Sequence, residues 1–455
     1  MLAVIAFLTP GALLAWARAS GRRMLPALAM VLLTALALPA LPWMLLGGAL
    51  ALLVLGTRSL WFEPWCRATP WLRPLRVRRW GKHGWASEVA AAGLGSLRAP
   101  TSPLLITSVG AAIHAQWTLP LGVTLADVER ERDSLAAFFD APRLDITPIR
   151  PSLVAFVWRW DEPLALPREA TAPTAGTVAV TDGFQLGRDE SGQPVTWRPL
   201  SPASHSLFVG GTRSGKSVSL QVCLTQLAAM PDVMVYGIDP TGLLLAPFAE
   251  GPDEDLISLG TDSESLAHAV EVLAHLVDVT LADRLAHLRS SRLDAIREPT
   301  AQMPAVMVVL EEYPAFLAAC SADDTAAGRK PNERLRARAE LYVQRLLAEG
   351  LKAAIVVMLA AQRADADVLG GYRRDQISTR VVFRLESADG WRMVLPSFPE
   401  IATLNEDLAP GEGYFQTPGQ PLARFRGDHL DYANYRDHVE QAMAWRRDHL
   451  SEIPI

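Results

Sequence analysis

The sequence has only three cysteines, and Cys66, Cys223 and Cys320 lie far apart along the chain. Their spacing argues against a disulfide framework and against a paired metal-binding motif, and it is typical of a reducing compartment. Positive charge is not in excess either, because 43 Lys and Arg residues face 49 Asp and Glu residues, for a formal net charge of −6. The overall charge therefore does not indicate nucleic-acid binding, although it leaves room for a locally positive channel.

Charge is missing altogether from two apolar stretches at the start of the chain. Neither Leu2–Trp16 nor Met24–Gly56 contains a charged residue. One helix over the second stretch would be about 50 Å long, against a hydrocarbon core of about 30 Å, and Pro39 and Pro42 would break it. The sequence therefore predicts a transmembrane segment of two to three spans at residues 1–57. An interfacial first segment followed by a hairpin is the alternative.

Residues 58–102 are predicted to be a juxtamembrane linker with a basic and aromatic collar. One group of arginines lies between the two apolar stretches, and another follows the second stretch. Three membrane spans place both basic groups on the cytoplasmic side. We predict a multi-pass protein of the cell membrane that contacts membrane lipid and keeps the rest of the chain in the cytoplasm. A DNA-contacting patch is the alternative for the collar. Its aromatic members are Trp61, Phe62, Trp65 and Trp71.

A small α/β adapter module is predicted at residues 103–166, and it shows no catalytic constellation. Thr124 and Asp127 have the spacing of a capping box at the start of a helix that is expected to reach Phe139. A Pro- and Ala-rich linker at residues 167–183 and a hairpin with a Ser-Gly turn follow. The strands expected around the helix are Val109–Leu119, Leu144–Ile149 and Leu153–Trp160.

The most informative motif is G-x-x-x-x-G-K-[ST], which begins at Gly210. In this pattern glycines let backbone N–H groups surround the phosphates of ATP, Lys216 reaches the β- and γ-phosphates, and the Ser217 hydroxyl coordinates Mg²⁺. A buried strand at Leu207–Val209 and a helix over Val218–Met230 supply the context that a P-loop requires. The residues expected to bind ATP are Gly210, Gly211, Thr212, Arg213, Ser214, Gly215, Lys216, Ser217 and Val218.

Two acids follow the apolar run Ala305–Leu310, which has the character of a central parallel strand. The carboxyl end of such a strand borders the nucleotide crevice. We therefore assign Glu311 to Mg²⁺ through a water molecule, and Glu312 to the orientation and deprotonation of the attacking water. The alternative is that both acids only open a surface helix.

Two further strands end in polar residues. Ala353–Leu359 precedes Gln362, which we expect to sense the γ-phosphate or position water, with a strand-end cap as the alternative. Val233–Ile238 ends in Asp239, which we interpret as a local backbone cap rather than a catalytic acid.

In this order, the motifs resemble the FtsK/SpoIIIE motor family. Gln376–Arg384 is similar to that family's "IPTRIAFRV" segment, and Pro410–Phe415 is similar to its "GRGDMLY" segment. The resemblance covers about residues 184–427. The other matching motifs are the P-loop, Ile238-Asp239-Pro240, Glu311-Glu312-Tyr313 and Ala361-Gln362-Arg363.

The resemblance implies a RecA-like P-loop NTPase motor of α/β class at residues 184–430, with a C-terminal helix or tail at residues 431–455. It implies a hexameric homo-oligomer that hydrolyses ATP and translocates double-stranded DNA. By the same likeness Arg380 is the candidate finger that enters a neighbouring subunit's site, with Arg384 as runner-up. Ion pairing at a subunit interface is the alternative. The family's Asp-Glu pair is Glu311-Glu312 here, a departure that keeps both carboxylates.

The membrane segment, basic collar, small module and single motor resemble the actinobacterial plasmid-transfer branch of that family. This likeness implies a membrane-anchored translocase of double-stranded DNA for conjugation or a related process. The residues after Asp428 are too few for a winged-helix recognition domain, so a separate DNA-loading partner is expected. The arginines of Arg329–Arg345 are expected to face either a DNA channel or solvent. Alternatives are a type VII secretion-like ATPase that moves protein and a nucleotide-gated membrane scaffold.

Overall fold

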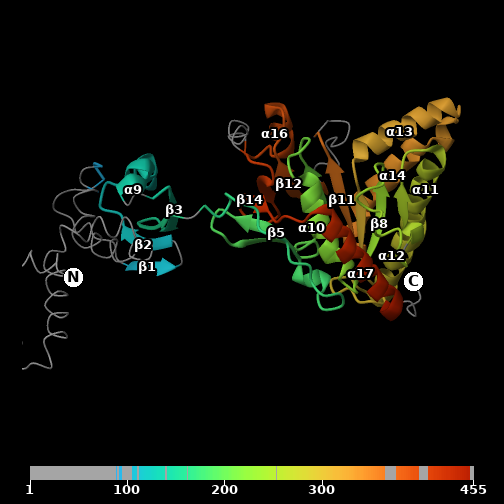
Figure 1. The fold of residues 1–455 in the computed structure, drawn as a ribbon, viewed down its shortest axis with the longest axis horizontal. Helices are drawn as coiled ribbons and strands as arrows, with labels where there is room; N and C mark the ends of the chain where they lie inside the picture. Colours follow the sequence, from blue (N-terminus) through green and yellow to red (C-terminus); the bar gives the residue numbers. More distant parts are fainter. Residues whose placement is uncertain are drawn as a thin grey trace, which may run out of the picture. The chain divides into compact units, whose positions relative to one another are not determined.

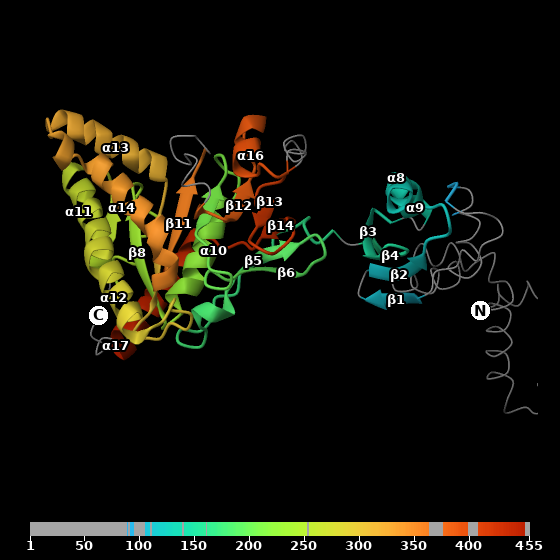
Figure 2. The same cartoon turned by 180° about the vertical axis from the view of Figure 1, so that it is seen from behind.

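Two units of the chain fold around separate sheets, with the division between Glu162 and Pro163. The computed structural model describes residues 89, 92–94, 105–109, 112–138, 141–160, 162–252, 254–363, 376–398 and 408–450. The predicted transmembrane segment at residues 1–57 lies outside these residues, as does most of the juxtamembrane linker. Figures 1 and 2 show each unit from two sides.

The N-terminal unit contains a four-stranded antiparallel sheet in the order β1-β2-β4-β3. The predicted capping box is confirmed at Thr124 and Asp127, but the helix is interrupted at Glu131. Trp158 is buried against the helices and donates a hydrogen bond from its indole N–H to the Leu135 carbonyl at 2.9 Å. The elements are β1 Leu105–Val109, β2 Ala112–Thr118, α8 Leu125–Arg130, α9 Arg132–Phe138, β3 Arg143–Arg150 and β4 Leu153–Arg159.

The C-terminal unit is built on a ten-stranded mixed sheet in the order β6-β5-β14-β13-β12-β7-β11-β10-β8-β9 (Figure 1). The strands from β12 to β9 run parallel, and antiparallel strands extend the sheet beyond β12. Its strands are β5 Phe184–Asp189, β6 Pro194–Trp197, β7 Ser206–Val209, β8 Val233–Asp239, β9 Ile257–Leu259, β10 Ala305–Leu310, β11 Ile355–Ala361, β12 Thr379–Phe383, β13 Glu412–Gln416 and β14 Ala423–Gly427.

Helices cover both faces of this sheet, which is why its central strands are apolar throughout. Successive residues of β10 alternate between two cores. Val306 and Val308 pack with α11, α13 and α14 on one face, and Met307 packs with α10 and α17 on the other. The helices are α10 Lys216–Ala228, α11 Ser263–His275, α12 Ala282–Ser291, α13 Tyr313–Ala326, α14 Leu335–Glu349, α16 Ala388–Val394 and α17 Tyr432–Leu450.

A buried histidine joins the P-loop strand to its neighbours. Val357 in β11 donates its N–H to His205 Nδ1 at 2.9 Å, and His205 Nε2 lies 3.1 Å from the Leu347 carbonyl of α14. Burial lowers the pKa of His205 to about 4. The ring is therefore neutral, with its proton on Nε2, and it fixes α14 against the sheet beside β7.

One helical stretch among the described residues is long and apolar enough to cross a membrane. It is Ser263–Ser291, in which a π-helical turn joins α11 to α12. Leu266, Val270 and Leu273 on this stretch are buried in the core of the C-terminal unit. Its apolar character therefore reflects packing against the sheet.

Residues 163–178 include most of the linker predicted at residues 167–183. They lie along the C-terminal unit, and we call them the strap. Ala170 donates its N–H to the His429 carbonyl at 2.8 Å, and Gly176 donates to the Ala229 carbonyl at 2.8 Å. The alanine and valine side chains of the strap contact the core beside α10. Composition indicated a linker because the segment has no periodicity, but its backbone groups find partners on the motor.

Candidate nucleotide-binding site

The P-loop connects β7 to α10, as the sequence predicts. Gly215 lies at the helix N-cap with φ of 106°, and a Cβ there would lie 2.6 Å from the Gly411 Cα. Only glycine fits this position. Within the described part of the chain, the N–H groups of Gly215, Lys216 and Ser217 have no acceptor. Free N–H groups at a helix N-terminus form a site for phosphate oxygens.

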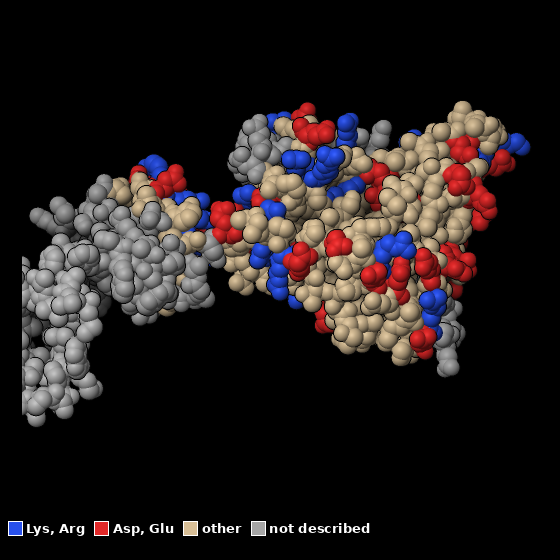
Figure 3. Space-filling view, viewed as in Figure 1, with Lys and Arg blue, Asp and Glu red and all other residues tan. Residues whose placement is uncertain are grey.

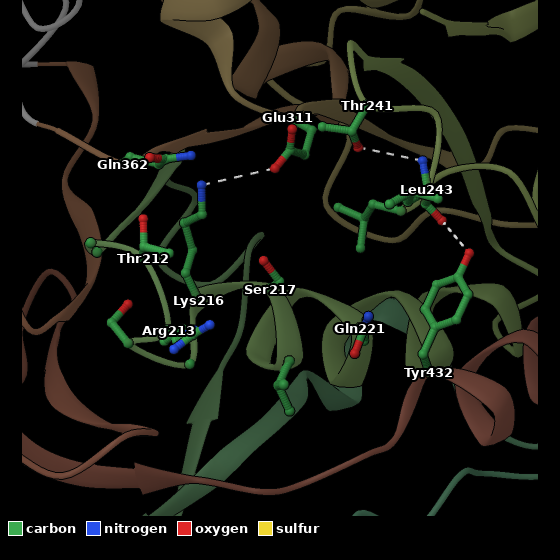
Figure 4. A pocket seen from close by; sticks show the side chains of 16 residues that line it. Thr212, Arg213, Lys216, Ser217, Gln221, Thr241, Leu243, Glu311, Gln362 and Tyr432 are labelled. Carbon is green, nitrogen blue, oxygen red and sulfur yellow. Dashed lines mark hydrogen bonds and ion pairs between the residues drawn. The ribbon is translucent and has the colours of Figure 1, made fainter.

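Lys216 lies between the two predicted acids. Its Nζ is 2.7 Å from Glu312 Oε2 and 3.9 Å from Glu311 Oε1, and the longer contact is drawn in Figure 4. The backbone N–H of Gln362 donates to Glu312 Oε1 at 3.1 Å. β10 and β11 are parallel neighbours, so their carboxyl ends bring these side chains together. The ion-paired cluster places four predicted site residues within direct reach of one another.

Glu311 is buried, and burial makes its charged form less favourable than it is in water. Burial raises its pKa to about 7, Lys216 opposes this rise, and Asp239 and Glu312 add to it. Glu311 Oε2 has no hydrogen-bond partner among the described residues. A buried carboxylate oxygen without a partner, in the same pocket as the exposed Ser217, fits a water bound to Mg²⁺. The residues present therefore suit ATP with Mg²⁺, although the side chains described include no cluster of three or more metal ligands.

Asp239 acts as the predicted backbone cap. Its Oδ1 accepts from the Thr241 and Gly242 N–H groups at 2.9 and 3.0 Å, and its Oδ2 accepts from the Leu244 and Leu245 N–H groups at 2.8 and 3.0 Å. The carboxylate is fully buried and occupied by the loop after β8. It shapes the edge of the site and also raises the pKa of Glu311.

A pocket of about 450 Å³ surrounds the P-loop and contains Glu311 and Gln362 (Figure 4). All nine residues predicted to bind ATP line it, with Val218 partly exposed rather than buried in the helix packing. Gln221 could have been inferred, because it lies one helical turn after Ser217 on the same face. Tyr432 comes from α17, and its hydroxyl donates to the Leu243 carbonyl at 2.9 Å. The lining residues that sequence reasoning missed are Gln221, Thr241, Leu243, Leu244 and Tyr432.

The predicted finger lies apart from this pocket. Arg380 is on β12, and its guanidinium donates to the Val394 carbonyl of α16 in the same chain at 2.7 Å. Arg384 is exposed, and its carbonyl accepts from the Gly211 N–H at 2.9 Å. Neither side chain lines the pocket of its own chain. The finger assignment concerns a neighbouring subunit and stays a prediction.

Sheet and site together define a P-loop NTPase motor of α/β class. Residues 180–398 match the FtsK/SpoIIIE family. The chain therefore carries an FtsK/SpoIIIE-family domain, and its class is the P-loop ATPase class of that family, as the motif order predicts.

Curated relatives agree with this assignment. The chain is 28% identical over 261 residues to DNA translocase FtsK 2 of Neisseria meningitidis, a match that covers 51% of this chain and 24% of that protein. It is 27% identical over 244 residues to DNA translocase SftA of Bacillus subtilis, covering 51% of this chain and 23% of the relative. The chain thus spans about a quarter of the length of the curated relatives it matches.

Two solved structures are also similar. The conjugation coupling protein TcpA of pCW3, determined with ATPγS, is 17% identical with a TM-score of 0.49, covering 80% of this chain and 99% of that one. The cytoplasmic domain of the type VII secretion ATPase EccC of Thermomonospora curvata is 22% identical with a TM-score of 0.45, covering 62% of this chain and 33% of that one.

Glu311→Gln is expected to stabilise the nucleotide-free protein at pH 8. The folded-state pKa of about 7 lies above the ordinary value of 4.5 for a glutamate, so the folded protein favours the protonated acid. The stability that this preference contributes is present below pH 4.5 and is lost as pH rises through 7. Replacing the carboxylate by a neutral amide should therefore raise the free energy of unfolding by roughly 1–3 kcal/mol at pH 8 and by much less at pH 5.

Denaturant unfolding at both pH values measures this change in the free energy of unfolding, and Glu298→Gln, which changes an exposed side chain, is the control. Equal destabilisation by Glu311→Gln at both pH values would contradict the raised pKa of Glu311 in the folded protein.

Proposed function

We propose that this chain hydrolyses ATP, and the observation that carries the proposal is the contact of Lys216 with Glu311 and Glu312 inside the P-loop pocket. Lys216 would exchange its carboxylate partner for the β- and γ-phosphates, because these carry more negative charge. That exchange would free Glu312 to accept the proton of the attacking water. Ser217 and Glu311 would hold Mg²⁺, which when bound neutralises charge on the phosphate oxygens.

Gln362 and Arg380 complete the proposed machinery. The Gln362 N–H holds Glu312 in place, and its exposed side chain faces the P-loop pocket, where it would position water. We assign Arg380 to the neighbouring subunit's site on family likeness, which requires it to leave the Val394 carbonyl on assembly. A homo-oligomeric ring, hexameric by the same likeness, would then share each site between two subunits.

Lys216→Ala and Glu312→Gln are each expected to lower ATP turnover by at least about 100-fold, because each removes a group that stabilises the transition state. Phosphate release by the purified protein measures this. Lys330→Ala and Glu298→Gln, which change exposed side chains of the same types, should keep normal rates. A normal rate in either site variant, with its fold intact by thermal melting, would remove that residue from the mechanism.

We propose that ATP hydrolysis drives translocation of double-stranded DNA. Support comes from the FtsK/SpoIIIE-family domain and from the DNA translocases that are its relatives. Lysines, arginines and acids are intermixed over the face in Figure 3, so a broad basic surface does not mark the DNA site there. Arg329 pairs with Asp323 and Asp324, and Arg345 lies 3.5 Å from Asp278. Arg329 and Arg345, at the two ends of the Arg329–Arg345 segment, are therefore ion-paired in the single chain.

Linear double-stranded DNA is expected to raise the ATPase rate several-fold, because a translocase couples hydrolysis to movement along its track. The rate is measured with double-stranded DNA, with single-stranded DNA and without DNA, at low and at physiological salt. Single-stranded DNA of equal phosphate content is the control for simple charge. An ATPase rate that is the same with and without DNA would argue against DNA as the translocated substrate. It would favour an ATPase of the type VII secretion kind that moves protein.

We further propose that residues 1–57 anchor the chain in the cell membrane with the motor in the cytoplasm, and that conjugal plasmid transfer is its process. The order of apolar segment, basic collar, module and motor in the sequence supports this, and a separate partner would load the DNA. Removing residues 1–57 should move the protein from the membrane fraction to the soluble fraction. The ATPase rate should persist, which separates loss of the anchor from loss of the fold. Continued membrane association after the deletion would refute the anchor.

A further inference from the structure

Gly411, in the turn before β13, supports the backbone of the P-loop. Its N–H donates to the Ser214 carbonyl at 2.8 Å, and its own carbonyl accepts from the Gly427 N–H at 2.8 Å. The two turns are packed so closely that a Cβ on Gly215 would lie 2.6 Å from the Gly411 Cα. The position of Gly411 therefore limits the conformations that the phosphate-binding loop can adopt.

A buried ion pair fixes the residue that follows Gly411. Glu412 begins β13 and lies directly opposite Arg426 of β14. Its Oε1 accepts a hydrogen bond from the Arg426 guanidinium at 3.2 Å, and its Oε2 accepts one from Arg424 at 2.8 Å. The side chains of Glu412 and Arg426 are only 8% and 10% exposed. Loss of either partner would leave the other charge buried and uncompensated, so the pair strongly constrains the turn that contains Gly411.

The strap supplies a second acceptor to Arg426. The guanidinium nitrogen that bonds to Glu412 also donates to the Leu164 carbonyl at 3.0 Å. Arg188 of β5 lies directly opposite Arg426 in the sheet and donates to the Leu166 carbonyl at 2.7 Å. Like charges that face each other across two strands are unfavourable. The two strap carbonyls accept from both arginines, so the docked strap stabilises an arrangement of charges that the strands alone disfavour.

The next residues of the strap are fixed just beyond the end of β14. The Arg168 carbonyl accepts from the His429 N–H at 2.7 Å, and Ala170 donates its N–H to the His429 carbonyl at 2.8 Å. The N-terminal unit ends at Glu162, immediately before the strap. A pull that is transmitted along the chain from Glu162 therefore reaches the contact of Leu164 with Arg426 before it reaches the contacts with His429.

We propose that Arg426 is a positioning residue for the P-loop and that the strap controls it. With the strap docked, Arg426 is oriented onto Glu412, and Gly411 keeps the P-loop in the conformation that binds phosphate. When the strap leaves the sheet, water replaces the Leu164 carbonyl, Arg426 turns away from Glu412, and the P-loop loses affinity for phosphate. Arg426 does not line the nucleotide pocket, so it acts through Gly411.

The strap thereby lets the N-terminal unit regulate nucleotide binding by the motor. This regulation rests on the proposed ATP binding at the P-loop. Because coupling between two binding events is reciprocal, a ligand in the P-loop also strengthens the docking of the strap.

A double-mutant cycle in the full chain tests this coupling, with calorimetry of ATPγS and of tripolyphosphate as the measurement. Arg426→Gln should weaken binding of both ligands about tenfold, because both place phosphates in the P-loop. Replacement of residues 163–170 by a Gly-Ser sequence of equal length should weaken both to a similar extent. The two changes together should weaken binding no further than either alone, because both act through Arg426. The same replacement at residues 171–174, which leaves Leu164 and Leu166 in place, is the matched control.

Two outcomes of the cycle would overturn the inference and leave ATP binding intact. One is tripolyphosphate binding that Arg426→Gln does not change. The other is a combined loss of about 100-fold, which would mean that the strap and Arg426 act independently. Partial loss of folded protein would lower the binding stoichiometry and leave the affinity unchanged, so it is distinguished from both. If the unaltered chain binds neither ligand, the proposed ATP binding is rejected together with this inference.

Hydrogen exchange tests the reciprocal effect of the ligand on the strap. In the unaltered chain, ATPγS and tripolyphosphate should each slow exchange at the Ala170 N–H, which is bonded to His429. In Arg426→Gln, saturating ATPγS should leave the exchange rate of this N–H unchanged. Equal protection of Ala170 in both proteins would show that the strap responds to nucleotide without Arg426, and would overturn its positioning role.

Discussion

A buried cation held between two carboxylates is the interaction on which the nucleotide-binding site of the C-terminal unit depends. Lys216, Glu311 and Glu312 are each largely removed from water, and an ionised group in that position must be compensated. Glu312 has Lys216 and the Gln362 N–H as partners, whereas Glu311 has one oxygen with no partner and a pKa raised to about 7. The charge arrangement is thus incomplete without a ligand. It favours a partner that brings both anionic oxygens for Lys216 and a cation for the acids, which is the composition of a nucleotide with its metal.

The sheet makes this arrangement possible because its central strands run parallel. Their carboxyl ends bring Val209, Leu310 and Ala361 to one edge, and each is followed by a residue of the site. The same edge is closed from the other side by Gly411, whose N–H bonds to the Ser214 carbonyl at 2.8 Å. The late glycine segment and the P-loop therefore position each other, although nearly 200 residues separate them in the chain.

The parts of the site that lie on short motifs at the ends of strands could be predicted from the sequence. An apolar run that ends in two acids, and a Gly-rich loop before a helix, each carry their chemistry within about ten residues, so Lys216, Glu311 and Glu312 could be assigned from sequence. Asp239 could also be assigned as a cap, because Pro-Thr-Gly after a strand is turn chemistry. Tyr432 and His429 could not be found, because α17 and the end of β14 reach the P-loop only through tertiary packing. The packing of the strap against the motor could not be predicted for a related reason, and the sequence indicated only a linker at residues 167–183. Its Pro and Ala residues carry no periodic pattern, and only its hydrogen bonds to His429 and Ala229 reveal where it lies.

The carboxylate of Glu312 contacts Lys216, and the backbone of the same residue has an unfavourable conformation. It caps α13 with φ of 40° and ψ of 52°, a left-handed conformation that costs a residue with a Cβ about 1 kcal/mol and costs glycine little. Folding alone would therefore favour glycine or asparagine at this position. A glutamate there gives up part of that stability and places a carboxylate 2.7 Å from the Lys216 Nζ. In a lineage that no longer needs ATP turnover, residue 312 should be among the first positions of the site to be replaced. Its replacement would record the loss of activity before the fold shows any change.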